Sequence, residues 1–288
     1  MPWPKEVPAK RYPSDLTDEE WQLLEPVFEE VEPYTTGRPR EKDLREIVNA
    51  IFYLNKTGCQ WRYLPKDFPS YKLVSYYYHK WVDNKTWEKI NTIVHRKLRK
   101  ELGRNEDPSA GIIDSQTVKG TPESVKESGF DGGKKIKGRK RHIVVDTTGY
   151  PIVVVVHAAN IYEGHAAKEV LSALFSIVNT VRKIWADGGY EGEAFIDGCK
   201  EKFNCVIEIV KKKKGFHVLP RRWVVERTFA WLNRYRRLSK DYERKPTSSQ
   251  SHVYVASIRL MLRRIFKERA KKLAESMALL PATNSAEA

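Results

Sequence analysis

Three acidic residues of this sequence stand where they could hold a metal ion. Asp114 lies in the apolar segment Gly-Ile-Ile-Asp-Ser, which predicts a short buried strand, and an unpaired charge there is costly. Asp187 lies where another predicted strand enters a Gly-Gly turn, and Glu226 lies on a predicted helix. Carboxylates from two strands and one helix can converge on two Mg²⁺ ions. Such ions prefer oxygen ligands and can clamp the attacking and leaving oxygens of a phosphoryl transfer.

Each acid also has a structural interpretation that the pattern leaves open. Asp114 could cap a turn or pair with a buried lysine, and Asp187 could be an ordinary residue of an Asp-Gly turn. Glu226 could form a surface ion pair with Arg222. In helical projection Glu226 lies away from the core, among arginines that keep a carboxylate ionised. The residues on that side are Arg222, Glu226, Asn233 and Arg237, and the opposite apolar stripe holds Val224, Thr228, Trp231, Leu232 and Tyr235.

The first third of the chain has only helical patterning. A capping box at Thr17 and Glu20 begins one helix. Apolar residues at helical spacing predict further helices over residues 41 to 57, 71 to 82 and about 87 to 102. These elements predict an all-helical N-terminal module, residues 1–105, in which residues 41 to 57 and 70 to 82 could form a helix-turn-helix-like pair that binds DNA.

Runs of β-branched residues begin near residue 110. The segments GIIDSQTVKG and RHIVVDTTGYPIVVVVHAAN predict three strands, the last two joined by a turn at Thr148-Gly149. A helix, a strand ending at Asp187, a helix, a strand and closing helices from Arg221 through Arg237 and beyond Lys267 follow. This is the order of the α/β ribonuclease-H-like fold, with a mixed five-stranded sheet whose first two strands are antiparallel and whose fourth is parallel to the first. We expect this catalytic domain to cover residues 106–270 and residues 271–288 to form a flexible tail.

The charge balance indicates a polyanionic partner. The 288 residues include 52 Lys and Arg against 37 Asp and Glu, a formal net charge of +15. Because the basic residues are clustered, nucleic acid is favoured over a merely soluble basic protein. Three cysteines without metal-site spacing argue against a disulfide framework or a zinc site. No apolar stretch has the length of a signal peptide or a membrane span, which predicts a cytoplasmic protein without a membrane partner.

Several segments in the right order resemble one known family. IIDSQTVK, GKKIKGRKRHIVVDTTGYPIVVVVHAAN, ADGGYEG and RRWVVERTFAWLNRYRRLSKDYE look like those of bacterial insertion-sequence transposases of the Asp-Asp-Glu type, insertion-sequence family 5. YPSDLTDEEWQLLEP, GRPR and YLNKTGCQWRYLPKDFP resemble the N-terminal region of the same family, so the likeness runs from about residue 12 to 267.

The resemblance implies that Asp114, Asp187 and Glu226 are a metal-binding catalytic triad on a ribonuclease-H-like core. It implies catalysis by two Mg²⁺ ions, for which Mn²⁺ can substitute. It also implies that the protein binds the terminal inverted repeats of its element, cuts there, and joins the 3′-OH ends to target DNA. Because two ends must meet, we expect a homodimer when DNA is bound, working in the cytoplasm on the nucleoid.

The sequence departs from a sister branch of the family around the third acid. Leu219 and Asn233 stand where that branch has Tyr and Lys, and Lys240 or Arg237 could replace the missing Lys. The interval of 39 positions from Asp187 to Glu226 leaves no room for a large insertion domain. Hairpin processing of the ends by such an insertion is therefore not expected.

Basic and aromatic residues give candidate DNA contacts in four segments, each of which could instead be a solvated loop or core. A Gly-Arg-Pro turn could reach a minor groove, residues 70 to 82 could be a recognition helix, a basic run could follow the phosphate backbone, and arginines crowd the Glu226 helix. The candidates are Arg38, Arg40, Tyr76, Tyr77, His79, Lys80, Lys134, Lys135, Lys137, Arg139, Lys140, Arg141, Arg222, Arg227, Arg234, Arg237 and Lys240.

Three other functions stay compatible with these residues. The chain could be a nuclease or resolvase that cuts DNA without joining it, which pre-cleaved ends would reveal. It could be a DNA-binding protein without catalysis, although all three acids are present. It could also be an RNA-binding structural protein, which would bind without metal-dependent cleavage.

Overall fold

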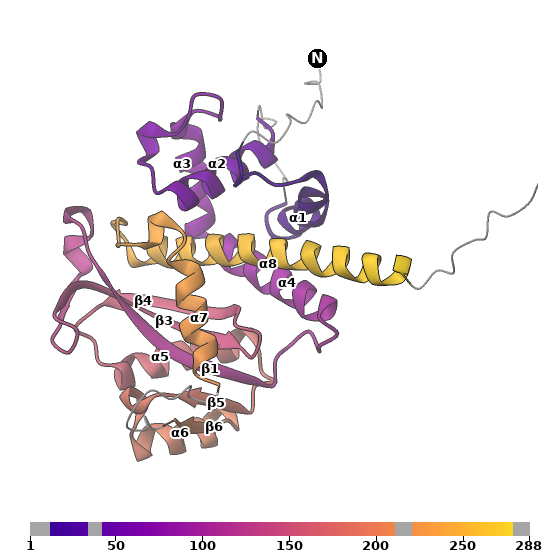
Figure 1. Cartoon of the computed structure of the whole chain (residues 1–288). Helices are drawn as coiled ribbons and strands as arrows, with labels where there is room; N and C mark the ends of the chain where they lie inside the picture. The colour runs from indigo at the N-terminus through magenta and orange to yellow at the C-terminus, as the bar shows by residue number, and fades with distance from the viewer. Residues whose placement is uncertain (1–11, 34–41, 211–220, 279–288) are drawn as a thin grey trace, which may run out of the picture.

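The computed structural model describes residues 12–33, 42–210 and 221–278, with the backbone alone for residues 193–195. Its centre is a twisted mixed sheet with helices on both faces. The helices α1, α2 and α3 lie beyond the long helix α8, and α4 runs alongside α8 (Figure 1). No helix in these ranges is both long enough and apolar enough to span a membrane.

The N-terminal part is helical, as the periodicity predicts. It comprises α1 (Asp18–Val31), α2 (Leu44–Thr57), the 3₁₀ turn η1 (Trp61–Tyr63), α3 (Tyr71–Asp83) and α4 (Thr86–Glu101). The capping box at the start of α1 is confirmed, because Thr17 and Glu20 each bond the other's backbone amide. Gly58 ends α2 with φ of 72°, a left-handed conformation that glycine adopts without the strain of a Cβ atom.

The sheet has one strand more than the five expected. It consists of β1 (Ala110–Lys119), β2 (Gly129–Asp131), β3 (Ile136–Asp146), β4 (Pro151–Ala158), β5 (Lys183–Ala186) and β6 (Val206–Ile209). The hydrogen-bonded order is β2-β3-β1-β5-β6, with β4 also paired to β3. β1 is antiparallel to β3 and parallel to β5, as predicted. The additional β2 escapes prediction because it has three residues and pairs with the outer end of β3.

Two hydrophobic cores cover the two faces of the sheet. Ile112 of β1 belongs to the core shared with α7 (Trp223–Leu232), α8 (Pro246–Ala278) and the N-terminal helices. Ile113 belongs to the core beneath α5 (Glu163–Ile177) and α6 (Glu193–Phe203). Because side chains alternate along a strand, Asp114 faces α7 and Ser115 faces α5.

The closing helices differ from the sequence prediction at both ends. The helix expected from Arg221 through Arg237 ends at Leu232, and a separate 3₁₀ turn, η4 (Arg236–Leu238), follows. The chain bends there because Tyr235 and Leu238 are buried in the core that contains α2. α8 continues to Ala278 through the segment predicted to be a tail, and residues 279–288 lie outside the described part.

The same core crosses the boundary predicted at residue 105. It contains Leu98 of α4, Val154 of β4 and Ile258 of α8, all without exposed surface. The division into a 1–105 module and a 106–270 domain stays a prediction, and the two parts share their interior.

Candidate active site

Asp114 and Asp187 meet at one arginine. The Nη2 atom of Arg222 lies 3.3 Å from Oδ2 of Asp114 and 3.6 Å from Oδ2 of Asp187. The Arg222 side chain is 5% exposed, and its Nε and Nη1 atoms are buried without a hydrogen-bond partner among the described residues. Two carboxylates, one on β1 and one at the end of the parallel strand β5, therefore converge on one cationic group.

The side chain of Tyr190 fixes the turn that carries Asp187. This turn is a 3₁₀ segment, η3 (Gly188–Tyr190), capped by the Asp187 carboxylate, which accepts from the Gly189 amide at 3.0 Å. Tyr190 is fully buried, and its hydroxyl lies 2.9 Å from Nδ1 of His142 on β3. His142 is the register partner of Ser115, the residue that follows Asp114 on β1. This hydrogen bond ties the Asp187 turn to β3, the strand paired with the one that carries Asp114.

Burial and nearby charge set the protonation of this group. Burial raises the pKa of Asp114 above its usual value; Arg222 and the Ser115 amide oppose this, and Asp187 adds to it. Burial, together with the Asp114 and Asp187 charges, raises the pKa of Tyr190 well above its ordinary range, so its hydroxyl stays protonated. Burial lowers the pKa of His142 well below its ordinary range, so the imidazole is neutral. The Nδ1 atom of a neutral imidazole can accept a hydrogen bond from the Tyr190 hydroxyl.

Glu226 does not take part in the contact between Asp114, Asp187 and Arg222. It is exposed on α7, four residues after Arg222, and side chains of a helix lean toward its N-terminus. At the other end of the helix, Asn233 accepts a 3.3 Å hydrogen bond from Gln116, which lies on the same face of β1 as Asp114. The helix face that carries Glu226 thus contacts β1 on either side of it. The helical projection places this whole face in solvent, whereas in the structure Glu226 is exposed and the residues on either side of it contact β1.

The donor chemistry of the site fits a divalent cation only in part. Two carboxylates, with oxygens suited to Mg²⁺, already face a single cationic group. In the described ranges, however, no three His, Cys, Asp or Glu residues are grouped closely enough to hold a metal ion.

Three residues of the basic run have internal partners, which corrects their assignment as DNA contacts. Arg139, Lys140 and Arg141 are each at most 4% exposed on β3. Arg139 bonds the Asp241 carboxylate and the carbonyls of residues 127, 243 and 244. Lys140 bonds Glu163 at 2.8 Å, and Arg141 donates to the carbonyls of residues 238 and 240. These side chains attach the segment after η4, and the start of α5, to the sheet.

Other candidates divide into internal and exposed residues. Arg222 and Arg237 are buried, and Arg237 pairs with Glu243. The helical projection places both in solvent and is wrong for these two residues. Arg227 is half-buried against Trp223 and Trp231 and donates to the Thr148 carbonyl. The exposed cations are Lys134, Lys135, Lys137, Arg234 and Lys240, and these stay candidates for DNA contact.

The predicted recognition helix, α3, has some of its candidate DNA contacts exposed and others packed against the protein. Tyr76 is 60% exposed and His79 is also exposed, whereas Tyr77 packs against Trp81 with ring centroids 5.4 Å apart. Lys80 forms an ion pair with the buried Glu32 of the α1 C-terminus. Arg38 and Arg40 lie outside the described residues.

The sequence reasoning did not identify Tyr190 or Glu163. Tyr190 had a visible signal, because it follows Asp187 by three residues in the motif ADGGYEG. Glu163 accepts from both Lys140 and Ser115, at 2.8 and 3.3 Å, beside the Asp187 turn. Its sequence context has no comparable signal, since its partners lie 23 and 48 residues away.

Comparison with known proteins defines the class of this chain. The family model described as a transposase DDE domain matches residues 105–255, which contain Asp114, Asp187 and Glu226. The chain therefore belongs to the DDE transposases. A second model, described as a putative transposase of the IS4/5 family, matches residues 16–91, which makes the chain an IS4/5-type member.

A curated relative agrees with this membership. The chain is 31% identical over 116 residues to a protein of Burkholderia cepacia named as a putative transposase for insertion sequence element IS402. That likeness covers 38% of this chain and 55% of the relative, so the chain spans about half the length of the curated protein it matches. No solved structure matches.

Proposed function

We propose that this protein is a DNA transposase with a ribonuclease-H-like catalytic core. It binds the terminal inverted repeats of its insertion sequence, cleaves the DNA at the ends, and joins the freed 3′-OH groups to target DNA. The observation that carries the proposal is the convergence of Asp114 and Asp187 on one cationic group beside the helix of Glu226.

Asp114, Asp187 and Glu226 would hold two Mg²⁺ ions, or Mn²⁺ in their place. When bound, such ions supply charge stabilisation for the attacking and leaving oxygens of an in-line displacement. The protein holds Asp187 through its own turn and through Tyr190, and holds Asp114 in the middle of β1. Glu226 approaches from α7 when Arg222 leaves the two aspartates.

The DNA partner is supported by charge. The formal net charge of +15 favours a polyanion, and the exposed lysines at the turn between β2 and β3 are free to follow a phosphate backbone. Binding through phosphate contacts weakens as salt rises, so activity should fall with ionic strength. Two DNA ends require two active sites, and we expect a homodimer on paired ends, working on the nucleoid in the cytoplasm.

The test is cleavage of duplex DNA carrying the element's end sequences, with Mg²⁺ or Mn²⁺. Glu226→Gln keeps the side chain's size and removes its charge, and Glu201→Gln on exposed α6 is the matched control. We expect wild type and Glu201→Gln to produce 3′-OH ends, and Glu226→Gln to bind DNA without cutting it. Equal cleavage by all three proteins would show that Glu226 is a surface residue and that the third ligand is wrong.

Strand joining separates a transposase from a nuclease. Pre-cleaved ends with free 3′-OH groups, offered with a target duplex, should give a covalent joined product with wild type. Cleavage without joining would establish a nuclease or resolvase. Binding without either reaction in any divalent metal would establish a DNA- or RNA-binding protein.

A further inference from the structure

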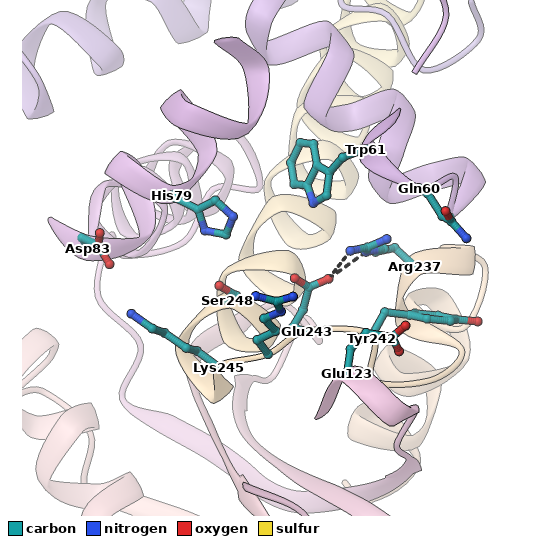
Figure 2. Close-up of a pocket in the computed structure, with 12 residues that line it drawn as sticks. Gln60, Trp61, His79, Asp83, Glu123, Arg237, Tyr242, Glu243, Lys245 and Ser248 are labelled. Atoms are coloured by element: carbon teal, nitrogen blue, oxygen red, sulfur yellow. Dashed lines mark hydrogen bonds and ion pairs between the residues drawn. The ribbon is translucent and has the colours of Figure 1, made fainter. Parts of the chain in front are cut away.

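A cavity of about 660 Å³ lies between the N-terminal helices and the segment that joins η4 to α8, and neither aspartate lines it. Figure 2 shows Trp61 and His79 projecting into it from η1 and α3, opposite Glu243, Lys245 and Ser248. Its volume is in the range of sites for small organic ligands. None of the roles proposed above for the aspartates or for the basic β2–β3 turn uses this cavity.

One wall of the cavity is aromatic. Trp61 is half-buried and is supported by Tyr78, with ring centroids 5.4 Å apart, and by His79 at 6.2 Å. Tyr242 also lines the cavity, and the Arg237 guanidinium lies over its ring, 5.5 Å from the ring centroid. Supported aromatic rings that line a cavity can stack on a planar ligand.

A carboxylate with an available oxygen forms the floor. Oε1 of Glu243 accepts from Nε and Nη2 of Arg237 at 2.7 and 2.6 Å, and lies 3.3 Å from Nε2 of His252. Within the described part of the chain, Oε2 of Glu243 has no recorded partner, and it is not buried away from solvent. Burial alone would raise the pKa of Glu243, but His252 and Arg237 outweigh it and lower the pKa to about 2. The floor therefore offers an ionised acceptor to an N–H donor.

The rim of the cavity carries charge of both signs. Arg244 and Lys245 are exposed, and neither side chain has an ion pair recorded with the described residues. Asp83 and Glu123 also line the opening. These acids, with Glu243, would repel a bare phosphate chain. A ligand with one phosphate and a flat ring that carries N–H donors suits all of these groups.

The cavity is joined to the catalytic strand. Gly120, next to the end of β1, forms an isolated parallel bridge with Asp241, two residues before Glu243. Lys119 is five residues along β1 from Asp114, which at about 3.3 Å per residue is roughly 16 Å. This length of β1 corresponds to a few nucleotides of an extended strand, so DNA that follows β1 from the aspartates comes to the segment that lines the cavity.

We propose that this cavity binds one unstacked nucleotide of the bound DNA, with its base stacked on Trp61. The exocyclic amino group of the base donates to Glu243, and the adjoining phosphate lies at Arg244 and Lys245. Thymine has no such amino group and is disfavoured. The inference rests on the proposed function, because it requires that the protein bind DNA.

The test is photocrosslinking from end-sequence duplexes to the full-length protein. 5-Iododeoxycytidine, which carries the amino group and crosslinks to aromatic side chains, replaces each nucleotide of the end sequence in turn. 5-Iododeoxyuridine, which lacks the amino group, is placed at the same positions, each analogue opposite its complementary base. Trp61→Leu removes the stacking ring. Tyr63→Leu is the matched control, because Tyr63 lies on the same 3₁₀ turn, is 75% exposed and does not line the cavity. Lys245→Glu alters the rim at an exposed position and does not depend on core packing.

We expect one DNA position to crosslink to peptides containing Trp61 or Tyr242. The yield should fall at least fivefold in Trp61→Leu and in Lys245→Glu, remain unchanged in Tyr63→Leu, and be higher for iodocytosine than for iodouracil at that position. Crosslinks at Tyr63, or at positions unaffected by Trp61→Leu and Lys245→Glu, overturn the nucleotide site while leaving the transposase intact. Absence of DNA binding in a gel-shift assay of wild type refutes the proposed function and this inference with it.

Discussion

The Tyr190 hydroxyl gives a sharp test of how the two aspartates are held together. Tyr190→Phe removes one oxygen and leaves the ring in place, so the Asp187 turn keeps its packing and loses its hydrogen bond to His142. The buried Nδ1 of His142 is then left without that partner, which costs about 1–3 kcal/mol of folding free energy.

The same change should loosen Asp187 relative to Asp114. Groups that orient a metal ligand typically change metal affinity or activity by about 10–100-fold when they are removed. We therefore expect the Mn²⁺ concentration for half-maximal DNA cleavage to rise by about tenfold or more in Tyr190→Phe. A merely structural role would lower the melting temperature and leave the metal dependence unchanged.

Tyr254→Phe is the matched control. The Tyr254 hydroxyl accepts a 2.9 Å hydrogen bond from the Val154 amide, and Tyr254 is 1% exposed on α8. This variant should lose a similar amount of stability, measured by thermal unfolding, with the wild-type metal dependence. If both variants shift the Mn²⁺ curve equally, or neither shifts it, the reasoning about Tyr190 is refuted.

Two further predictions concern the buried charges that hold the C-terminal segment. Arg139→Ala should destabilise the fold by about 3–5 kcal/mol in denaturant unfolding, because it leaves the Asp241 carboxylate buried without its cation. Lys134→Ala, at the exposed turn, should change stability by less than about 0.5 kcal/mol and weaken DNA binding; the reverse ranking would contradict the division of the basic run. Because the pKa of Glu243 is depressed from 4.5 to about 2, its ionised form stabilises the fold above pH 4.5, and this contribution is lost as pH falls toward 2. Melting temperatures between pH 6 and 3 should therefore fall more steeply for wild type than for Glu243→Gln, and parallel curves would refute the assignment.

Local periodicity was sufficient for most of the elements. Apolar spacing predicted α2, α3 and α4 to within three residues at their starts and one at their ends, because each buries one continuous stripe against a neighbour. The β-branched runs predicted β1, β3 and β4, and the turn residues Thr148-Gly149 predicted the connection between β3 and β4. The sequence missed β2 and placed the end of α7 too late, because both depend on packing partners that no local pattern contains.

The sequence by itself predicted which two aspartates lie at the ends or in the middle of buried strands, and the tertiary structure decided which charges face solvent. Asp114 and Asp187 could be predicted, since a carboxylate in or at the end of a buried strand needs a cationic partner. Arg139, Lys140 and Arg141 resemble Lys134 and Lys135 as letters in one basic run, yet the first three are buried and the last two are exposed. A buried charge is stable only where its partners are supplied, and for Arg139 they lie about 100 residues away, beyond the reach of any local pattern.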